Sequence, residues 1–587
     1  MSDGESAEIE PEVAQGEVLD DEQREAVDAD ERAIAVLAGP GSGKTRVLSY
    51  RARRLLIDDA GARALLLTFT NKAAAEMKAR ALGVAAVMSG RIQASTFHTF
   101  GLRVLRSHGA LVGIEPDFEI LDRDEQETFA AEAAHAAGAR AQRGRWSYLR
   151  LRREDVIDES VGAFGRAYEA AKRAARVVDF DDLIVYTADL LKQHLEIAEA
   201  YGTRFSHLLV DEFQDTNAAQ FAIVKALCEH VTTVSVFADD DQAIYRFAGA
   251  EAENIRRFIA ALGAREYPLT FNYRCREAII AHANRLIAAD PEASGRQMRH
   301  VYEGGEVRHR AFHDEEAEAA SIARDIQSLI DRGVEPADIS VLARAAWRAT
   351  PILETLERGG VPTTNWLGEA FEPPERQMLG VILSVLRASV NDRQAKKLCE
   401  LLGVPESDER RVQAFLEQAA DAPAVPELLR LRDLAYGDAP PSAVIAHAQL
   451  CAIVLDAELA EAMTPIVDAV AALEADDPEF TLEHVLSELA LGGIGLAPTA
   501  GGGVKVASLH RTKGLQWPRV YIVGLEQGTL PDYRTETEAA LSEERRACFV
   551  GVCRAETHLT LTRIEQYRGF GKPPSIFLEE MGIDPYD

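Results

Sequence analysis

The feature that most constrains this chain is a glycine-rich loop that follows a short apolar strand near its start. Residues 34–45 read IAVLAGPGSGKT. Small residues let backbone N–H groups crowd around phosphate oxygens, Lys44 can reach the outer phosphates, and the Thr45 hydroxyl can hold Mg²⁺. The strict pattern has glycine where Ala38 stands, and alanine restricts the turn only slightly. We assign the following residues to a predicted phosphate site: Ala38, Gly39, Pro40, Gly41, Ser42, Gly43, Lys44, Thr45 and Arg46.

An acidic pair at the end of another apolar strand supplies what hydrolysis of a bound nucleotide needs. Residues 208–216 read LLVDEFQDT, so the strand delivers Asp211 and Glu212 to the edge of the sheet. Asp211 can hold the metal ion, and Glu212 can orient the attacking water. A glycine-rich turn without function would explain neither this pair nor Lys44. The two motifs together predict hydrolysis of a nucleoside triphosphate.

The composition is that of a soluble globular protein, with 47% hydrophobic and 27% charged residues. A chain of 587 residues is long enough for roughly three to five domains. No apolar run reaches the roughly 18 residues of a membrane span, and the acidic N-terminus is unlike a signal peptide. The six cysteines form no C-x-x-C pair, which argues against a zinc ribbon or an iron–sulfur cluster. We therefore expect a cytoplasmic protein without a membrane partner.

The net charge of −31 acts against a nucleic-acid partner, because phosphate binding usually relies on a basic surface. Net charge is a global sum, however, and a channel for DNA needs only a local basic lining. The charge therefore leaves nucleic-acid binding open.

Short apolar strands alternate with helices along most of the chain, which predicts parallel sheets covered on both faces. Two helical stretches interrupt this alternation, and we expect no buried strand in the first of them. The expected units are a disordered tail at 1–18, a first core at 19–106 and 179–265 with a helical insertion at 107–178, and a second core at 266–390 and 499–587 with a short helical insertion at 391–498.

A series of motifs in a fixed order gives the chain its resemblance to a known family. The motifs are LDDEQREAV (19–27), the phosphate loop, TFTNKAAAEMKAR (68–80), STFHTFGLRVLR (95–106), DFDDLI (179–184), VDEFQDTN, DDDQAIYRFAGA (239–250), LTFNYRCREAI, SLHRTKGLQWP (508–518) and SEERRACFVGVCRAE (542–556). In this order they resemble superfamily 1 helicases of the UvrD/Rep/PcrA type. The resemblance implies an α/β fold of two RecA-like cores, with ATP and Mg²⁺ as cofactors.

The resemblance assigns three side chains to the nucleoside part of ATP. Gln23 is expected to read the adenine edge, because a side-chain amide offers a donor and an acceptor together. Tyr273 is expected to stack on the base. Gln516 stands where the family usually has glutamate near the ribose hydroxyl, and an amide can still bond that group.

The family's catalytic groups correspond to Glu212, Gln242, Arg274 and Arg554 in this chain. Gln242 stands where the family senses the γ-phosphate. The two arginines are expected to reach the γ-phosphate from the second core. There an arginine stabilises the charge of the transition state, which raises the rate of hydrolysis by about 10³–10⁵. Cys553 replaces a common threonine just before Arg554, and cysteine is a poorer hydrogen-bond partner. Because the arginines and the phosphate loop lie on different cores, hydrolysis is expected to couple to opening and closing of the cleft.

The family's contacts with single-stranded DNA fall on the following residues: Phe69, Asn71, His98, Tyr245, Phe247 and His510. Aromatic faces suit single strands, because every base has a π-face worth about 1–3 kcal/mol when stacked. Taken alone, Phe69 or His98 would more often be a core residue, and a core position also stays open for Tyr245 and Phe247. Phe247 stands where the family often has tryptophan, which gives a smaller stacking face.

The leading hypothesis is an ATP-dependent translocase that moves 3′→5′ along single-stranded DNA and unwinds duplex at single/double-strand junctions. Its polarity is implied by the resemblance alone. The alternative is a DNA-stimulated ATPase switch that regulates a protein partner, such as a nuclease or a repair or replication factor, with little unwinding of its own. A small-molecule kinase would share the phosphate loop but would leave the other motifs unexplained.

Overall fold

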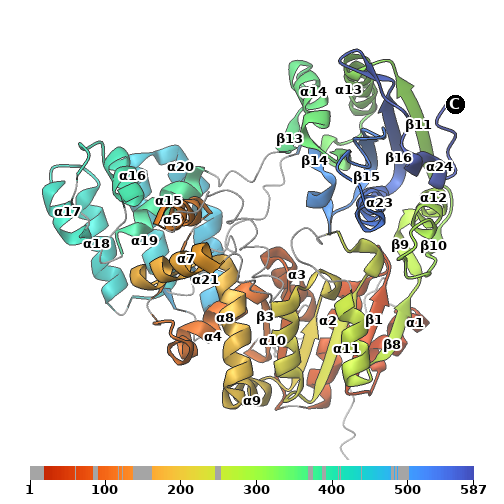
Figure 1. Cartoon of the computed structure of the whole chain (residues 1–587). Coiled ribbons are helices and arrows are strands. Elements are labelled where there is room, and N and C mark those ends of the chain that lie inside the picture. The colour runs from red at the N-terminus through yellow and green to blue at the C-terminus, as the bar shows by residue number, and fades with distance from the viewer. Residues whose placement is uncertain are drawn as a thin grey trace, which may run out of the picture.

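The computed structural model describes residues 19–586 apart from 60, 83–89, 117, 122, 137–161, 245–252, 368–373, 387–391, 408, 410, 438, 477–480, 483–484, 487–488 and 490–501. Figure 1 shows two sheet-based cores, the second above the first, with a group of helices to their left. Both sheets have six strands, and all their paired strands run parallel, which confirms the expected α/β fold. Within the described residues, no helix is long and apolar enough to cross a membrane.

The first core is a sheet in the order β3-β2-β6-β7-β1-β8. Its strands are β1 (Ala33–Ala38), β2 (Ala64–Thr68), β3 (Ile92–Thr96), β6 (His207–Val210), β7 (Thr233–Ala238) and β8 (Arg265–Leu269). Its helices are α1 (Asp21–Asp28), α2 (Lys44–Asp58), α3 (Asn71–Leu82), α4 (Phe97–His108), α8 (Phe180–Gln193), α9 (Leu195–Arg204), α10 (Ala218–Cys228) and α11 (Glu253–Leu262). Strands β1, β2 and β6 are buried along their whole length, as expected where helices cover both faces. The carboxyl ends of β1 and β6 therefore open onto one edge of the sheet.

The first sheet ends in β8, where Ile34–Ala38 of β1 pairs with Arg265–Leu269. The expected boundary gave residues from 266 onward to the second core, so it cut this strand off from its sheet. The chain then leaves the first core through β9 (Phe271–Arg276), which pairs with β10 (Arg299–Tyr302) in a separate ribbon. Residues 265–276 thus form two strands in two different sheets. The boundary was misplaced because the apolar pattern of these residues does not mark where the chain changes sheets.

The second core is a sheet in the order β11-β16-β15-β12-β14-β13. Its strands are β11 (Glu306–Phe312), β12 (Ile339–Ala343), β13 (Thr363–Trp366), β14 (Val504–Ser508), β15 (Trp517–Val523) and β16 (Ala555–Ile564). Its helices are α12 (Glu277–Ala288), α13 (Glu315–Asp331), α14 (Ala346–Arg358), α23 (Glu538–Val552) and α24 (Ile576–Glu580), and a short ribbon joins β17 (Gln566–Tyr567) to β18 (Phe570–Gly571). Residue 510 follows the carboxyl end of β14 and residue 516 precedes β15, and β12 lies between these two strands in the sheet.

Two helical regions leave the cores. The first contains α5 (Arg123–Ala136) and α7 (Gly162–Ala175), with a short parallel pair of β4 (Glu119–Ile120) and β5 (Val177–Val178). Both residues of β5 are buried, whereas we expected no buried strand there.

The second helical region contains α15 (Pro374–Ser384), α16 (Asp392–Leu402), α17 (Val412–Gln418), α18 (Val425–Tyr436), α19 (Pro441–Leu455), α20 (Ala457–Ala462) and α21 (Thr464–Asp476). Leu379, Ile382 and Leu383 of α15 belong to the hydrophobic cluster of these helices. We expected the region to begin at residue 391, because an amphipathic pattern does not reveal which core a helix packs against. The other domain bounds stay predictions.

Candidate functional site

The phosphate loop connects the end of β1 to the start of α2. Gly41 and Gly43 have φ angles of 69° and 82°, which residues with a side chain rarely adopt. A Cβ atom at Gly41 would lie 2.7 Å from the Cβ of Arg274, and one at Gly43 would lie 2.8 Å from Nε2 of Gln23. The glycines therefore let other parts of the site approach the loop. Ala38 is the last residue of β1 and packs in the core, so its departure from glycine falls on strand rather than on the turn.

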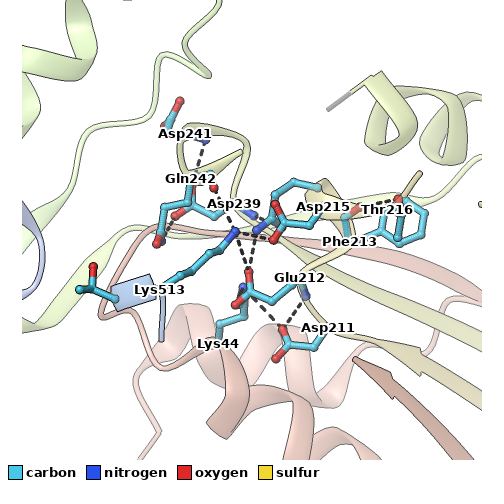
Figure 2. Close-up of polar contacts among 12 residues, drawn as sticks. Lys44, Asp211, Glu212, Phe213, Asp215, Thr216, Asp239, Asp241, Gln242 and Lys513 are labelled. Carbon is cyan, nitrogen blue, oxygen red and sulfur yellow. Dashed lines mark hydrogen bonds and ion pairs between the residues drawn. The ribbon is translucent and has the colours of Figure 1, made fainter. Parts of the chain in front are cut away.

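The acidic pair follows β6 and meets the loop lysine, as Figure 2 shows. Nζ of Lys44 lies 2.7 Å from Oε1 of Glu212 and 3.5 Å from Oδ1 of Asp211. The side-chain amide of Gln214 donates to Oε2 of Glu212 at 2.6 Å. Glu212 has a φ of 52°, a left-handed conformation that directs its carboxylate toward the loop. Lys44, Asp211 and Glu212 are thus brought together as expected.

Opposing effects set the charge of this pair. Burial raises the pKa of Glu212, but the ammonium groups of Lys44 and Lys513 outweigh burial and hold that pKa well below the usual range. Burial raises the pKa of Asp211, against the attraction of Lys44. Glu212 is therefore a carboxylate at neutral pH, which is the state that can accept a proton from water.

The second core reaches across to the first through Arg554 and Lys513. Nη2 of Arg554, directly after α23, donates to Oε1 of Gln242 at 2.9 Å. Nζ of Lys513 donates to the Gln242 carbonyl at 3.0 Å and pairs with Asp215. Figure 2 shows Lys513 between Gln242, Asp215 and Glu212. Gln242 also donates to Asp239 at 2.5 Å, so one amide touches both cores.

Arg274 lies in β9, through which the chain passes from the first core to the second. Its Nε donates to Oε1 of Gln516 at 2.6 Å, and its Nη1 donates to the Cys553 carbonyl at 3.3 Å. Asn272, two residues earlier, is buried and donates to the Pro40 carbonyl at 2.7 Å. The strand that carries Arg274 is therefore tied directly to the phosphate loop.

Gln23 and Tyr273 both bond to Asp20, and Gln23 also contacts the phosphate loop at Ser42. The amide of Gln23 donates to the Ser42 carbonyl at 2.9 Å, and the Gln23 backbone N–H donates to Asp20 at 2.8 Å. The hydroxyl of Tyr273 donates to the other oxygen of Asp20. Tyr273 is 37% exposed, so part of the residue is accessible to a ligand. Arg46 is half-buried on α2, near the Tyr50 ring.

Thr45 and Asp211 fit a Mg²⁺ ion that arrives with the nucleotide. A hydroxyl and a carboxylate are the hard oxygen donors that Mg²⁺ prefers, and Mg²⁺ is usually held by one or two side chains together with substrate phosphates. The described residues contain no group of three or more His, Cys, Asp or Glu that could hold a metal. The Lys44 ammonium beside Asp211 and Glu212 offsets their charge.

The predicted DNA contacts follow the carboxyl ends of strands in both sheets. Phe69 follows β2 and packs edge-on against Phe97 with ring centroids 5.9 Å apart. His98 follows β3 and meets Phe180 at 6.3 Å. His510 follows β14, where burial and the charge of Arg344 lower its pKa to about 4, so its ring is neutral. All three rings are half-buried. Tyr245, Phe247 and the side chain of Asn71 lie outside the described residues.

The sequence analysis missed four residues that hold the site together: Asp20, Gln214, Asn272 and Lys513. Each lies inside one of the quoted motifs, but its position in the motif gave no role in binding phosphate, metal or base. Lys513 is the most informative, because it contacts Glu212, Asp215 and Gln242 of the opposite core. The signal that could have identified it was the presence of a lysine inside the motif SLHRTKGLQWP.

Comparison with known proteins gives matches for both cores. Residues 19–262 match the model of the UvrD/REP helicase N-terminal domain, and residues 267–438 and 455–566 match that of the UvrD-like helicase C-terminal domain. The chain is 30% identical to DNA helicase II of Escherichia coli strain K12, over 96% of this chain and 87% of that protein. It is 28% identical to the ATP-dependent DNA helicase PcrA of Staphylococcus epidermidis strain RP62A, over 97% of this chain and 87% of that protein.

Proposed function

The chain belongs to the UvrD/REP family of helicases, and we propose on this premise that it is an ATP-dependent DNA helicase. In this proposal it moves 3′→5′ along single-stranded DNA and separates the strands at single/double-strand junctions. The polarity rests on the family resemblance. The cytoplasmic location expected from the sequence also stays a prediction.

The observation that carries the proposal is the contact between Arg554 and Gln242 across the two cores. Gln242 lies in the short turn after β7, on the same edge of the first sheet as Glu212. A side chain bonded to both cores changes its surroundings whenever the cores separate. Hydrolysis at this edge and relative motion of the cores are therefore linked, which is what a motor on DNA requires.

We assign the hydrolytic roles as the family motifs do. Thr45 and Asp211 would hold the Mg²⁺ ion that arrives with ATP, and that ion would supply positive charge to the phosphates. Lys44 exchanges its ion pair with Glu212 for the phosphates, and the freed carboxylate accepts a proton from the attacking water. Arg274 and Arg554 place guanidinium groups on the γ-phosphate side of the site. Gln23, Tyr273 and Gln516 hold the nucleoside.

For the DNA we assign Phe69, Asn71, His98, Tyr245, Phe247 and His510. Phe69, His98 and His510 support this assignment by position, because each lies within two residues of the carboxyl end of a parallel strand. Ligands of open α/β sheets bind at that edge. A single strand lying along it would pass from the first core to the second.

The second candidate is a DNA-stimulated ATPase switch that regulates a protein partner such as a nuclease or a repair or replication factor. The net charge of −31 favours it, since long-range repulsion from DNA would limit processive movement. Both candidates use the same hydrolytic residues.

Two assays separate these candidates. ATP hydrolysis should rise with added single-stranded DNA, and duplexes with a 3′ tail should be unwound while those with a 5′ tail are not. Lys44→Ala serves as the inactive control. DNA-stimulated hydrolysis without strand displacement on either substrate would favour the switch, and hydrolysis indifferent to DNA would reject the helicase.

A further inference from the structure

Two of the six cysteines lie next to each other directly behind the arginines of the nucleotide site. Cys275 follows Arg274 in β9, and Cys553 precedes Arg554 at the end of α23. The thiol of Cys275 donates to the Cys553 carbonyl oxygen at 3.6 Å, and both cysteines are buried in the same hydrophobic cluster. They are 278 residues apart in sequence, so only the fold brings them together.

The backbone around this pair holds the arginines. Nη1 of Arg274 donates to the same Cys553 carbonyl that faces the Cys275 thiol. The backbone N–H groups of Arg274 and Cys275 both donate to Oδ1 of Asn272, at 2.8 and 2.7 Å, and Asn272 reaches the phosphate loop at Pro40. A change in the distance between the two cysteines therefore moves Arg274 relative to the loop.

The two sulfur atoms differ in chemistry. The hydrogen bond from the Cys553 thiol lowers the pKa of Cys275, and the positive charges of Arg274 and Arg554 lower it further against the effect of burial. Burial raises the pKa of Cys553 well above its usual value. Cys275 is thus the more acidic of the two thiols and the better nucleophile toward an oxidant, and Cys553 is suited to resolve the product as a thiol.

The site lies close to solvent although both thiols are buried. Tyr273 and Gln516, the neighbours of Arg274, are exposed. Arg274 links exposed Gln516 to the Cys553 carbonyl that faces the Cys275 thiol, so the pair lies close behind exposed side chains. The pKa of Cys228 and that of Cys451, by contrast, are each raised to about 12 by burial, which keeps these thiols protonated.

We propose that Cys275 and Cys553 are an oxidative modification site, in which hydrogen peroxide joins them in a disulfide that displaces Arg274 and Arg554 and stops ATP hydrolysis. The Cys275 thiolate attacks one peroxide oxygen, the O–O bond breaks, and a sulfenic acid and hydroxide form. The Cys553 thiol then attacks the Cys275 sulfur, and the hydroxyl leaves as water once protonated. Two thiols and one peroxide thus give one disulfide and two waters, and an added dithiol reverses the change.

The test begins with the nucleotide-free full-length protein treated with hydrogen peroxide and then with dithiothreitol. Mass spectrometry of the digested, alkylated protein should show a peptide pair linked through Cys275 and Cys553. ATP hydrolysis should fall at least tenfold with the disulfide and return with the dithiol. The expected loss of hydrolysis rests on the proposed ATPase activity, whereas formation of the linked peptide does not. A protein that forms the linked peptide but shows no ATP hydrolysis before oxidation would therefore contradict the proposed function and not the disulfide.

Two substitutions and one control complete the test. Cys275→Ser and Cys553→Thr keep a hydrogen-bonding side chain of similar size, and each variant should keep its own rate within twofold after peroxide. Cys548→Ala removes another buried thiol of α23 and should respond to peroxide as the wild type does. A linked peptide with an unchanged rate, no linked peptide at all, or equal reversible inactivation of Cys275→Ser would overturn the proposal.

Discussion

Glu212 is held in a left-handed backbone conformation between two lysines from different cores. Lys44 belongs to the phosphate loop and Lys513 to the second core, and both ammonium groups lie within 4.0 Å of the Glu212 carboxylate. A non-glycine residue at positive φ persists only where its surroundings fix it, and such residues gather at functional sites. The conformation and the charge of Glu212 both fit a group that accepts a proton during hydrolysis.

Replacing Glu212 with glutamine should abolish turnover without removing the binding site. The amide keeps the shape of the side chain but cannot accept the proton, so we expect ATP hydrolysis to fall about 10²–10⁴-fold. Binding of a fluorescent ATP analogue should persist. Glu229→Gln, at the exposed end of α10, is the matched control and should leave hydrolysis unchanged. A rate for Glu212→Gln within threefold of the wild type would remove the residue from the mechanism.

Asp239 should make the stability of the protein depend on pH. Burial, together with repulsion from Asp241, raises its pKa to about 7. A carboxyl group whose pKa is raised by folding stabilises the protein at low pH, and that contribution is lost as the pH rises from about 4 to about 7. The midpoint of thermal unfolding should therefore fall more between about pH 5 and about pH 8 in the wild type than in Asp239→Asn. Asp468→Asn, an exposed carboxylate of α21, should behave as the wild type, and equal pH dependence in all three proteins would contradict the assignment.

At the scale of single elements, the phosphate loop depends on close approach as well as on backbone freedom. Gly41→Ala places a methyl group 2.7 Å from the Cβ of Arg274, whereas Gly113, the site of the control variant Gly113→Ala, has a similarly positive φ and open space where its Cβ would lie. Both variants should lose about 1–2 kcal/mol of stability through the left-handed conformation. Only Gly41→Ala should lose ATP hydrolysis, by at least about 100-fold, because a strained loop no longer cradles phosphates. Comparable hydrolysis in the two variants would show that contact with Arg274 is unimportant.

The buried strands could be predicted from the sequence because each is a short apolar run between helical stretches. The apolar runs before the phosphate loop and before the acidic pair form β1 and β6, each of which begins one residue earlier than the quoted run. The boundary at β8 and the placement of α15 could not be predicted, since both depend on which neighbour an apolar surface meets. The same dependence on tertiary neighbours decides which residues of the candidate site could be predicted. Lys44, Asp211 and Glu212 are recognisable from spacing alone, whereas Lys513 matters only because the second core brings it within reach of Asp215.

At the scale of the whole molecule, the acidic surface should shape how DNA binds. Each phosphate neutralised in a local groove makes the logarithmic salt slope about 0.7 more negative for a single strand. Repulsion from a protein with a charge of −31 acts in the opposite direction and weakens as salt screens it. We expect measurable single-strand affinity with a weak negative slope, read from fluorescence anisotropy over a salt series. A steep slope would show that repulsion is negligible, and no binding at any salt concentration would reject the DNA site.

The most direct test of coupling between the cores is a double-mutant cycle on Arg554 and Gln242, the side chains that bond across the cleft at 2.9 Å. DNA-stimulated ATP hydrolysis would be measured for the wild type, Arg554→Ala, Gln242→Ala and the double variant. If the pair acts as one unit, the double variant should lose little more activity than the more damaging single variant, with a coupling energy of about 0.5–3 kcal/mol. If the loss of activity in the double variant equals the product of the losses in the two single variants, the two side chains act independently. That result would contradict a site whose activity depends on the contact between the two cores.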